Sequence, residues 1–107
     1  MKKNFLNDVA VLLIFFCRYE QTKEVFDAIK EARPSRLYLY QDAPRDGRED
    51  DLKGVMACRE LVSDQNIDWE CEVHRFYQEK NMGCDPSEYI AQKWMFGKGQ
   101  IHSAFCS

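Results

Sequence analysis

An unbroken run of apolar residues near the start of the sequence constrains the fold more than any other feature. Residues 9–16 read Val-Ala-Val-Leu-Leu-Ile-Phe-Phe, with no polar side chain at alternate positions. A strand that is apolar at every position is typical of a parallel sheet, because helices then cover both of its faces. Including Cys17 the run is still far shorter than the roughly 20 residues of a membrane-spanning helix. It therefore predicts a buried strand.

The flanks of this run do not favour a secretory signal peptide. Lys2 and Lys3 precede the run, as in a signal peptide, but Asp8 lies directly before it. Residues 17–20 (Cys-Arg-Tyr-Glu) lack the small side chains of a cleavage site. The five cysteines of the chain show no framework spacing, which favours reduced thiols. We therefore expect a cytoplasmic protein.

The rest of the sequence alternates between helical and strand patterns. Apolar residues at helical spacing predict helices over residues 22–32, 50–62 and 85–96. Residues 37–40 predict a second strand. Residues 69–76 predict a third, whose strict apolar–polar alternation indicates an edge strand with one solvated face. The order βαβαβα predicts an α/β fold, a three-layer Rossmann-like half-domain with a parallel sheet.

The loops that follow the three predicted strands are the candidate site. In an open parallel sheet, ligands bind beyond the carboxyl ends of the strands. The three loops, residues 16–20, 41–46 and 77–84, offer aromatic rings, carboxylates and cations. The start of the third helix adds unpaired N–H groups that attract anions. This composition suits a nucleotide diphosphate. The alternative is that these loops are merely polar, as βα loops are in every such fold.

Several other kinds of site are not supported. The sequence contains no Walker loop, no Gly-x-Gly-x-x-Gly and no Gly-x-Ser-x-Gly. A zinc site of Cys71, His74 and Cys84 is disfavoured, because strand residues three apart face opposite sides. Cys17 is better explained as a buried structural thiol than as a nucleophile. The net charge of -3 argues against a nucleic-acid binder.

Three landmarks, taken in order, resemble the N-terminal, donor-binding half of GT-A-type nucleotide-diphospho-sugar transferases, close to glycosyltransferase family 2. Residues 16–20 (Phe-Cys-Arg-Tyr-Glu) stand where relatives commonly have a turn such as Asn-Arg-Pro-Glu. Residues 42–45 (Asp-Ala-Pro-Arg) are similar to the Asp-Gly-Pro-Arg of one bacterial branch. Residues 80–84 (Lys-Asn-Met-Gly-Cys) are similar to the Lys-Asn-Leu-Gly-Cys of that branch. The resemblance covers roughly residues 8–96.

The resemblance implies a function and a set of site residues. The chain would bind a nucleotide-diphospho-sugar donor for transfer of the sugar to an acceptor, with Asp42 in contact with the base or ribose. The turn at residues 18–20 would border the nucleotide, and residues 81–83 would close over it. Cys17 and Tyr19 depart from the family pattern, in which Asn and Pro are usual. The implied binding residues are Phe16, Arg18, Tyr19, Glu20, Asp42, Arg45, Lys80, Asn81 and Gly83.

One part of the family pattern has no match. In relatives a fourth strand ends in an Asp-x-Asp-like motif that holds Mn²⁺ or Mg²⁺ on the donor diphosphate. Here the acidic residues Glu49, Asp50 and Asp51 follow a loop, so we expect them to open a helix and complement its dipole. Residues 97–107 are expected to form an irregular tail. We therefore expect residues 1–96 to be a truncated donor-binding half, inactive as an isolated chain, with no metal ligand or catalytic residue of its own.

Two strand orders follow from these alternatives. The order of the family, 3-2-1-4, would reduce to 3-2-1 and leave the first strand at an unpaired edge, through which the chain could associate with itself. The order 2-1-3 would give the first strand a neighbour on both sides. It would describe a small, complete flavodoxin-like binding or regulatory module without catalysis. We expect the order 3-2-1.

Overall fold

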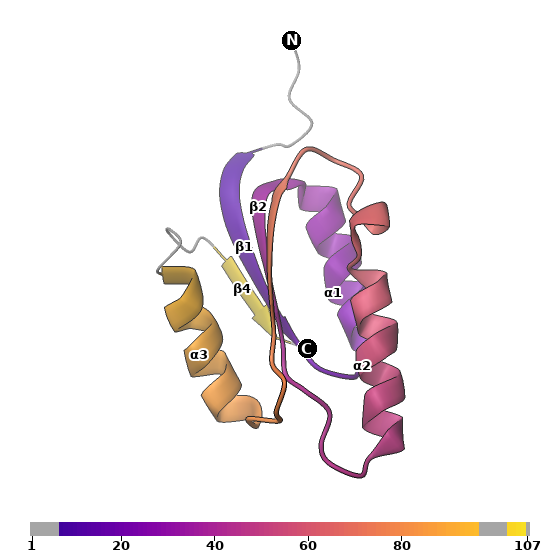
Figure 1. The fold of residues 1–107 in the computed structure, drawn as a ribbon. Helices are drawn as coiled ribbons and strands as arrows, with labels where there is room; N and C mark the ends of the chain where they lie inside the picture. Colours follow the sequence, from indigo (N-terminus) through magenta and orange to yellow (C-terminus); the bar gives the residue numbers. More distant parts are fainter. Residues whose placement is uncertain (1–6, 97–102, 107) are drawn as a thin grey trace.

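The computed structural model describes residues 7–96 and 103–106 as an α/β fold (Figure 1). The βαβαβα succession predicted from the sequence is confirmed, with bounds that differ from the predicted ones by a few residues. The elements are β1 (Asn7–Phe15), α1 (Tyr19–Ala32), β2 (Pro34–Gln41), α2 (Glu49–Leu61), a short 3-10 helix (Asp64–Asn66), β3 (Glu72–Tyr77), α3 (Cys84–Phe96) and β4 (Ser103–Cys106). Within the described ranges, no helix is both long enough and apolar enough to cross a membrane.

The strands form one parallel sheet in the order β3-β2-β1-β4. The predicted order 3-2-1 is confirmed, and the alternative order 2-1-3 is wrong. β1 is paired on both sides, since Leu12 lies opposite Tyr38 of β2 and Ala104 of β4. The unpaired first strand that would have allowed self-association is therefore absent from the described part of the sheet.

The prediction of an irregular tail is wrong for residues 103–106, which form β4. The rest of that segment, residues 97–102 and 107, lies outside the described residues. The physical reason for β4 is the open edge of β1. The N–H and C=O groups on this edge of β1 gain hydrogen-bond partners when a short segment pairs with them.

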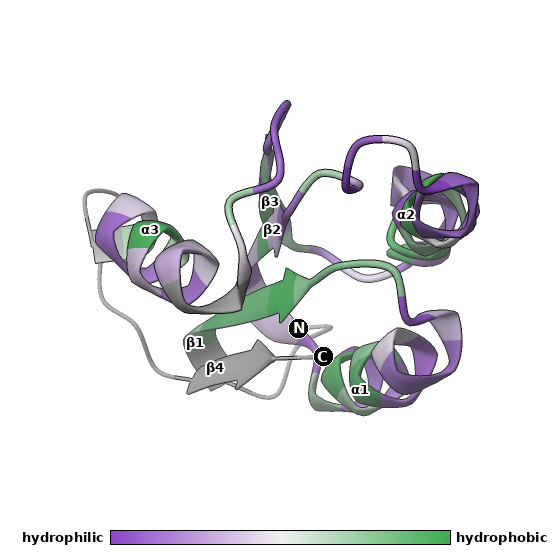
Figure 2. Ribbon diagram, turned by 90° about the horizontal axis from the view of Figure 1, so that it is seen from below, coloured by the Kyte–Doolittle hydropathy of each residue, from purple (hydrophilic) through white to green (hydrophobic). Residues whose placement is uncertain are grey.

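Two helix layers enclose the sheet and explain the unbroken apolar run. α1 and α2 cover one face and α3 covers the other (Figures 1 and 2). On β1, Val11 and Leu13 belong to a core cluster that includes Phe26 of α1 and Cys58 of α2. The alternate positions of β1 belong to a second cluster on the α3 side, which includes Ala10, Leu12, Ile14, Ala91 and Met95. Each face of β1 is buried, so each position is apolar.

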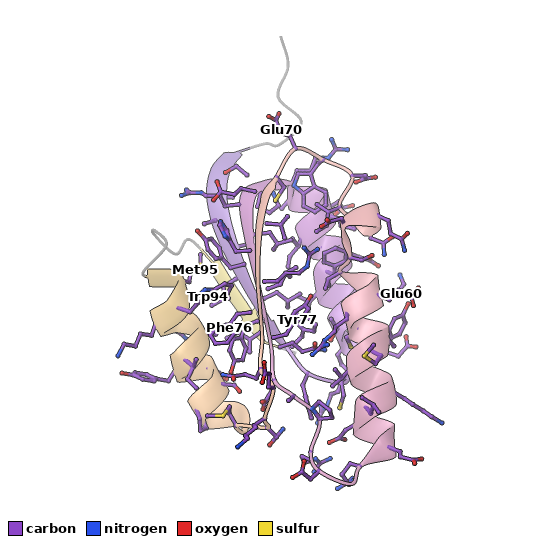
Figure 3. All side chains as sticks on the ribbon, in the orientation of Figure 1. Glu60, Glu70, Phe76, Tyr77, Trp94 and Met95 are labelled. Carbon is purple, nitrogen blue, oxygen red and sulfur yellow. The ribbon has the colours of Figure 1, made fainter. Side chains whose placement is uncertain are left out.

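β3 is the edge strand that the alternating pattern predicts. Its side chains alternate between the two faces, with Phe76 toward α3 and Tyr77 toward α2 (Figure 3). The Phe76 ring lies 5.4 Å from the ring of Trp94, between centroids. The face predicted to be solvated is therefore partly covered. The imidazole of His74 stacks on the Tyr38 ring, at 4.8 Å between centroids.

Candidate functional site

A pocket of about 570 Å³ lies at the carboxyl ends of β1 and β2, beside the start of α3. In Figure 1 the loops that follow β1, β2 and β3 meet at this lower edge of the sheet. β1 has β2 on one side and β4 on the other, so the chain reverses its direction of winding there. Ligands of open parallel sheets bind at this kind of switch point. The pocket is lined by Ile14, Phe15, Phe16, Cys17, Arg18, Asp42, Arg45, Asn81, Gly83 and Ser87.

The structure brings most of the predicted site residues together here. Six line the pocket: Phe16, Arg18, Asp42, Arg45, Asn81 and Gly83. Tyr19, Glu20 and Lys80 do not line it. α1 begins at Tyr19, which turns Tyr19 and Glu20 toward grooves along the outside of the helix. Lys80 is exposed in the loop between β3 and α3.

The Asp42 carboxylate is buried and holds the loop between β3 and α3. Its Oδ1 accepts hydrogen bonds from the backbone N–H groups of Ala43 and Met82, at 2.9 and 2.8 Å. Its Oδ2 accepts from the backbone N–H of Gly83 at 3.0 Å and from Nδ2 of Asn81 at 3.2 Å. Asn81 Nδ2 also donates to the carbonyl oxygen of Ala43 at 2.8 Å. The ends of β2 and β3 are therefore joined through one side chain.

These contacts define what Asp42 can do for a ligand. A carboxylate has about four lone-pair sites, and four donors occupy those of Asp42. A base or ribose that bonds to this carboxylate has to displace one of those donors. What Asp42 does in the structure is to fix Asn81 and Gly83, which line the pocket.

A second buried side chain, Gln41, joins the loop after β1 to α2. Its Nε2 donates to the carbonyl oxygens of Phe16 and Val55, at 2.9 and 3.0 Å. Its Oε1 accepts from Nε of Arg59 at 2.6 Å, and the Arg59 guanidinium lies over the Tyr77 ring. Gln41 thus connects the end of β1 to α2. Both polar atoms of its amide are hydrogen-bonded, as is usual for a buried polar group.

Arg45 lines the pocket and forms an ion pair with Asp51. Nε and Nη2 of Arg45 donate to Oδ2 and Oδ1 of Asp51, at 2.7 and 3.0 Å. The backbone N–H of Arg45 also donates to Oδ2, at 3.2 Å. The hydrogen bonds from the Arg45 side chain are the main cause that lowers the pKa of Asp51 from 3.8 to about 2.

This ion pair is expected to contribute to the loss of stability of the fold at acidic pH. The folded-state pKa of Asp51 is lower than its unfolded value, so the contribution to stability is complete above about pH 4. It is lost as the pH falls from about 4 to about 2. Unfolding midpoints measured across this range should fall less steeply for Asp51→Asn than for the unchanged chain. Because Arg45 is half-exposed, added salt should reduce the difference. Parallel slopes at low salt would contradict the prediction.

Cys17 is a free thiol in the pocket wall, and its surroundings do not favour a nucleophile. Burial, and then the charge of Asp51, raise the pKa of the Cys17 thiol above its ordinary value. The thiolate is the reactive form, so this environment disfavours reaction. The backbone of Cys17 instead lies against Gly54 of α2, where an added Cβ would be 2.2 Å from the Cys17 carbonyl oxygen.

The carboxylates near the pocket do not fit a divalent cation. Asp42 is occupied by N–H donors and Asp51 by Arg45. Glu49 and Asp50 are exposed in the first turn of α2, so the predicted helix start is confirmed. In the part of the chain that the structure describes, no group of three or more His, Cys, Asp or Glu could hold a metal.

Five residues that line or shape the pocket were not among the predicted site residues, and Cys17, described above, is one of them. Ile14 and Phe15 form part of its apolar wall. Ser87 also lines it, and its Oγ accepts from the Tyr40 hydroxyl at 3.2 Å. Asp51 does not line the pocket but forms the ion pair with Arg45, which does. The sequence does contain a signal for this ion pair. Asp51 lies in the first turn of a predicted helix, six residues after an arginine in the preceding loop.

Comparisons of the chain with protein-family models, with curated proteins and with solved structures found no match.

Proposed function

We propose that the pocket binds the nucleotide-diphosphate part of a sugar donor, as in the donor-binding half of a GT-A-type glycosyltransferase. The observation that supports this best is the composition of the pocket at the switch point of the sheet. Two arginines, Arg18 and Arg45, line it, whereas its one carboxylate, Asp42, is already bonded to four donors. Such a pocket favours an anionic ligand.

The apolar wall supports a ligand that has a flat or hydrophobic part as well as a charge. Ile14, Phe15 and Phe16 lie along one side of the pocket. Small-molecule sites commonly combine apolar walls with a few polar groups that fix orientation. A nucleoside diphosphate has both parts, a base for the apolar wall and a diphosphate for the arginines.

The three sequence landmarks support the same class of ligand. They stand at the ends of β1, β2 and β3, and parts of all three line the pocket. The strand order β3-β2-β1-β4 is the order that the family resemblance implies. Ser103–Cys106 takes the place of the fourth strand, but its four residues include no carboxylate. We therefore propose donor binding without sugar transfer for this chain.

Calorimetric titration of the chain with UDP, GDP, uridine and guanosine tests the proposal. We expect one diphosphate to bind at least about tenfold more tightly than its nucleoside, because the two arginines would contact the phosphates of the ligand and not its base or ribose. Arg18→Ala should remove much of that advantage. Lys30→Ala is the matched control, because it removes one positive charge near the far end of α1.

Two results would count against the proposal. Equal affinity for a nucleoside and its diphosphate would show that the pocket does not recognise phosphate. Hydrolysis of a UDP- or GDP-sugar by the purified chain, dependent on Mn²⁺, would contradict donor binding without transfer.

A further inference from the structure

One edge of the Arg45 guanidinium is bound to Asp51, and the other makes no hydrogen bond with the residues that the structure describes. The edge formed by Nε and Nη2 faces Asp51, with both donors in hydrogen bonds. A guanidinium has five N–H donors, so three remain on the outer edge. The Arg45 side chain is half-exposed (49%) and lines the pocket, whereas the Asp51 side chain is almost completely buried (3%). The acceptor that holds Arg45 is thus shielded from ligands, while the remaining donors are accessible.

The backbone around Asp51 makes the acceptor rigid. Asp51 lies in the first turn of α2, and its Oδ2 also binds the backbone N–H of Arg45. Gly54, three residues further along α2, lies directly against the backbone of Cys17 in the pocket wall. α2 is therefore fixed relative to the pocket, and so is the carboxylate that it presents to Arg45.

We propose that Asp51 is a positioning residue, which holds Arg45 so that its free edge binds the phosphate oxygens of the ligand in the pocket. The inference rests on the proposed function for the identity of that ligand as a nucleoside diphosphate. The planar guanidinium matches two phosphate oxygens only in a limited set of orientations. Fixing the orientation in advance reduces the side-chain entropy that binding would otherwise remove.

The charge of Asp51 makes the proposal testable by the sign of an effect. Considered only as a charge, Asp51 weakens anion binding, because a carboxylate repels phosphate. Considered as a support for Arg45, it strengthens binding. Asp51→Asn removes the charge and one acceptor oxygen at nearly constant volume. Weaker binding in this variant is explained by positioning and is the opposite of what charge alone predicts.

Calorimetry of the full chain with inorganic pyrophosphate, UDP and GDP at low salt measures this effect. We expect Asp51→Asn to weaken pyrophosphate and nucleoside diphosphate binding by about fivefold to tenfold. Arg45→Ala should weaken it at least as much, and the double variant should bind no more weakly than Arg45→Ala alone. Unchanged or tighter binding by Asp51→Asn would overturn the inference.

Two further variants separate positioning from charge and from folding. Asp50→Asn is the matched control, because Asp50 is the exposed neighbour of Asp51 on α2, and its loss should leave binding unchanged or slightly tighter. Arg45→Lys keeps the positive charge but lacks the planar fork. It should bind the anions about as weakly as Asp51→Asn, and it decides the question if Asp51→Asn does not fold. If Arg45→Lys bound these anions as tightly as the unchanged chain does, the inference would be overturned.

The ligand series distinguishes the two proposals. Pyrophosphate binding that depends on Asp51 and Arg45, without any preference for a nucleoside diphosphate, supports the inference and overturns the proposed function. Nucleoside diphosphate binding that is indifferent to Asp51→Asn and Arg45→Lys overturns the inference alone. Absence of binding by pyrophosphate and by both nucleotides overturns both.

Discussion

Replacement of Gly54 by alanine is expected to lower the free energy of unfolding by about 3 kcal/mol. An alanine Cβ at this position would lie 2.2 Å from the carbonyl oxygen of Cys17 and 2.8 Å from its Cβ. Because the closest atoms belong to the backbone, α2 or the loop after β1 has to move. The same substitution at a solvent-exposed position within a helix would instead stabilise the fold by about 1 kcal/mol. Chemical denaturation measures the difference.

Two other substitutions serve as controls for Gly54→Ala. Lys53→Ala changes the exposed neighbour on α2 and should alter stability by less than about 0.5 kcal/mol. Gly47→Ala replaces a glycine at φ +74° that has no atom within 4 Å of the added Cβ, so it tests backbone strain without a clash. It should cost about 1 kcal/mol. A Gly54→Ala chain as stable as the unchanged one would show that α2 does not need this close contact.

Replacement of Asp42 by alanine is expected to cost about 3 kcal/mol and to loosen the loop between β3 and α3. The substitution removes the acceptor of the backbone N–H groups of Met82 and Gly83. The side-chain amide of Asn81 also loses one of its two acceptors. Asp42→Asn should not restore stability, because its amide nitrogen would face N–H donors. Denaturation and amide hydrogen exchange at Met82 and Gly83 measure the two effects.

The control is Asp46→Ala, which removes an exposed carboxylate from the same loop as Asp42. It should leave both the denaturation midpoint and the exchange rates of Met82 and Gly83 unchanged. Unaltered exchange at these amides in Asp42→Ala would mean that the loop is held by other contacts. Asp42 would then be available to a ligand, as the family resemblance implies.

The layered fold could be predicted because its signals are local. Alternating burial on the two faces of β1 requires an apolar residue at each position, and the sequence of residues 9–16 shows that directly. The start of α1 was harder to locate. Its N-cap position, Arg18, makes no side-chain capping hydrogen bond, and Thr22, which resembles a cap, is buried inside the helix. Without a capping residue, nothing in the sequence marks this boundary.

The meeting of the loops at one edge of the sheet could be predicted, whereas the contacts of the individual side chains could not. The carboxyl ends of the strands follow from the topology, so the meeting of Arg18, Asp42 and Arg45 at one pocket was predictable. The partners of Asp42 were not, because Met82 and Gly83 are about forty residues away in the sequence. β4 was missed for a related reason. Its four residues have no periodicity of their own, and the open edge of β1 decides their conformation.

The pairing of β1 with β4 has a kinetic consequence. Val11 and Ser103 are neighbours in the sheet although nearly the whole sequence separates them. A contact between residues so far apart has the largest entropy cost of loop closure, and it forms slowly. The crossovers that join β1, β2 and β3 are shorter, so their closure costs less entropy. We expect β1, β2 and β3 to pair before β4 joins the sheet, during synthesis as well as on refolding. The switch point beside the pocket would then be completed last, and the apolar edge of β1 would be exposed to other chains until that moment.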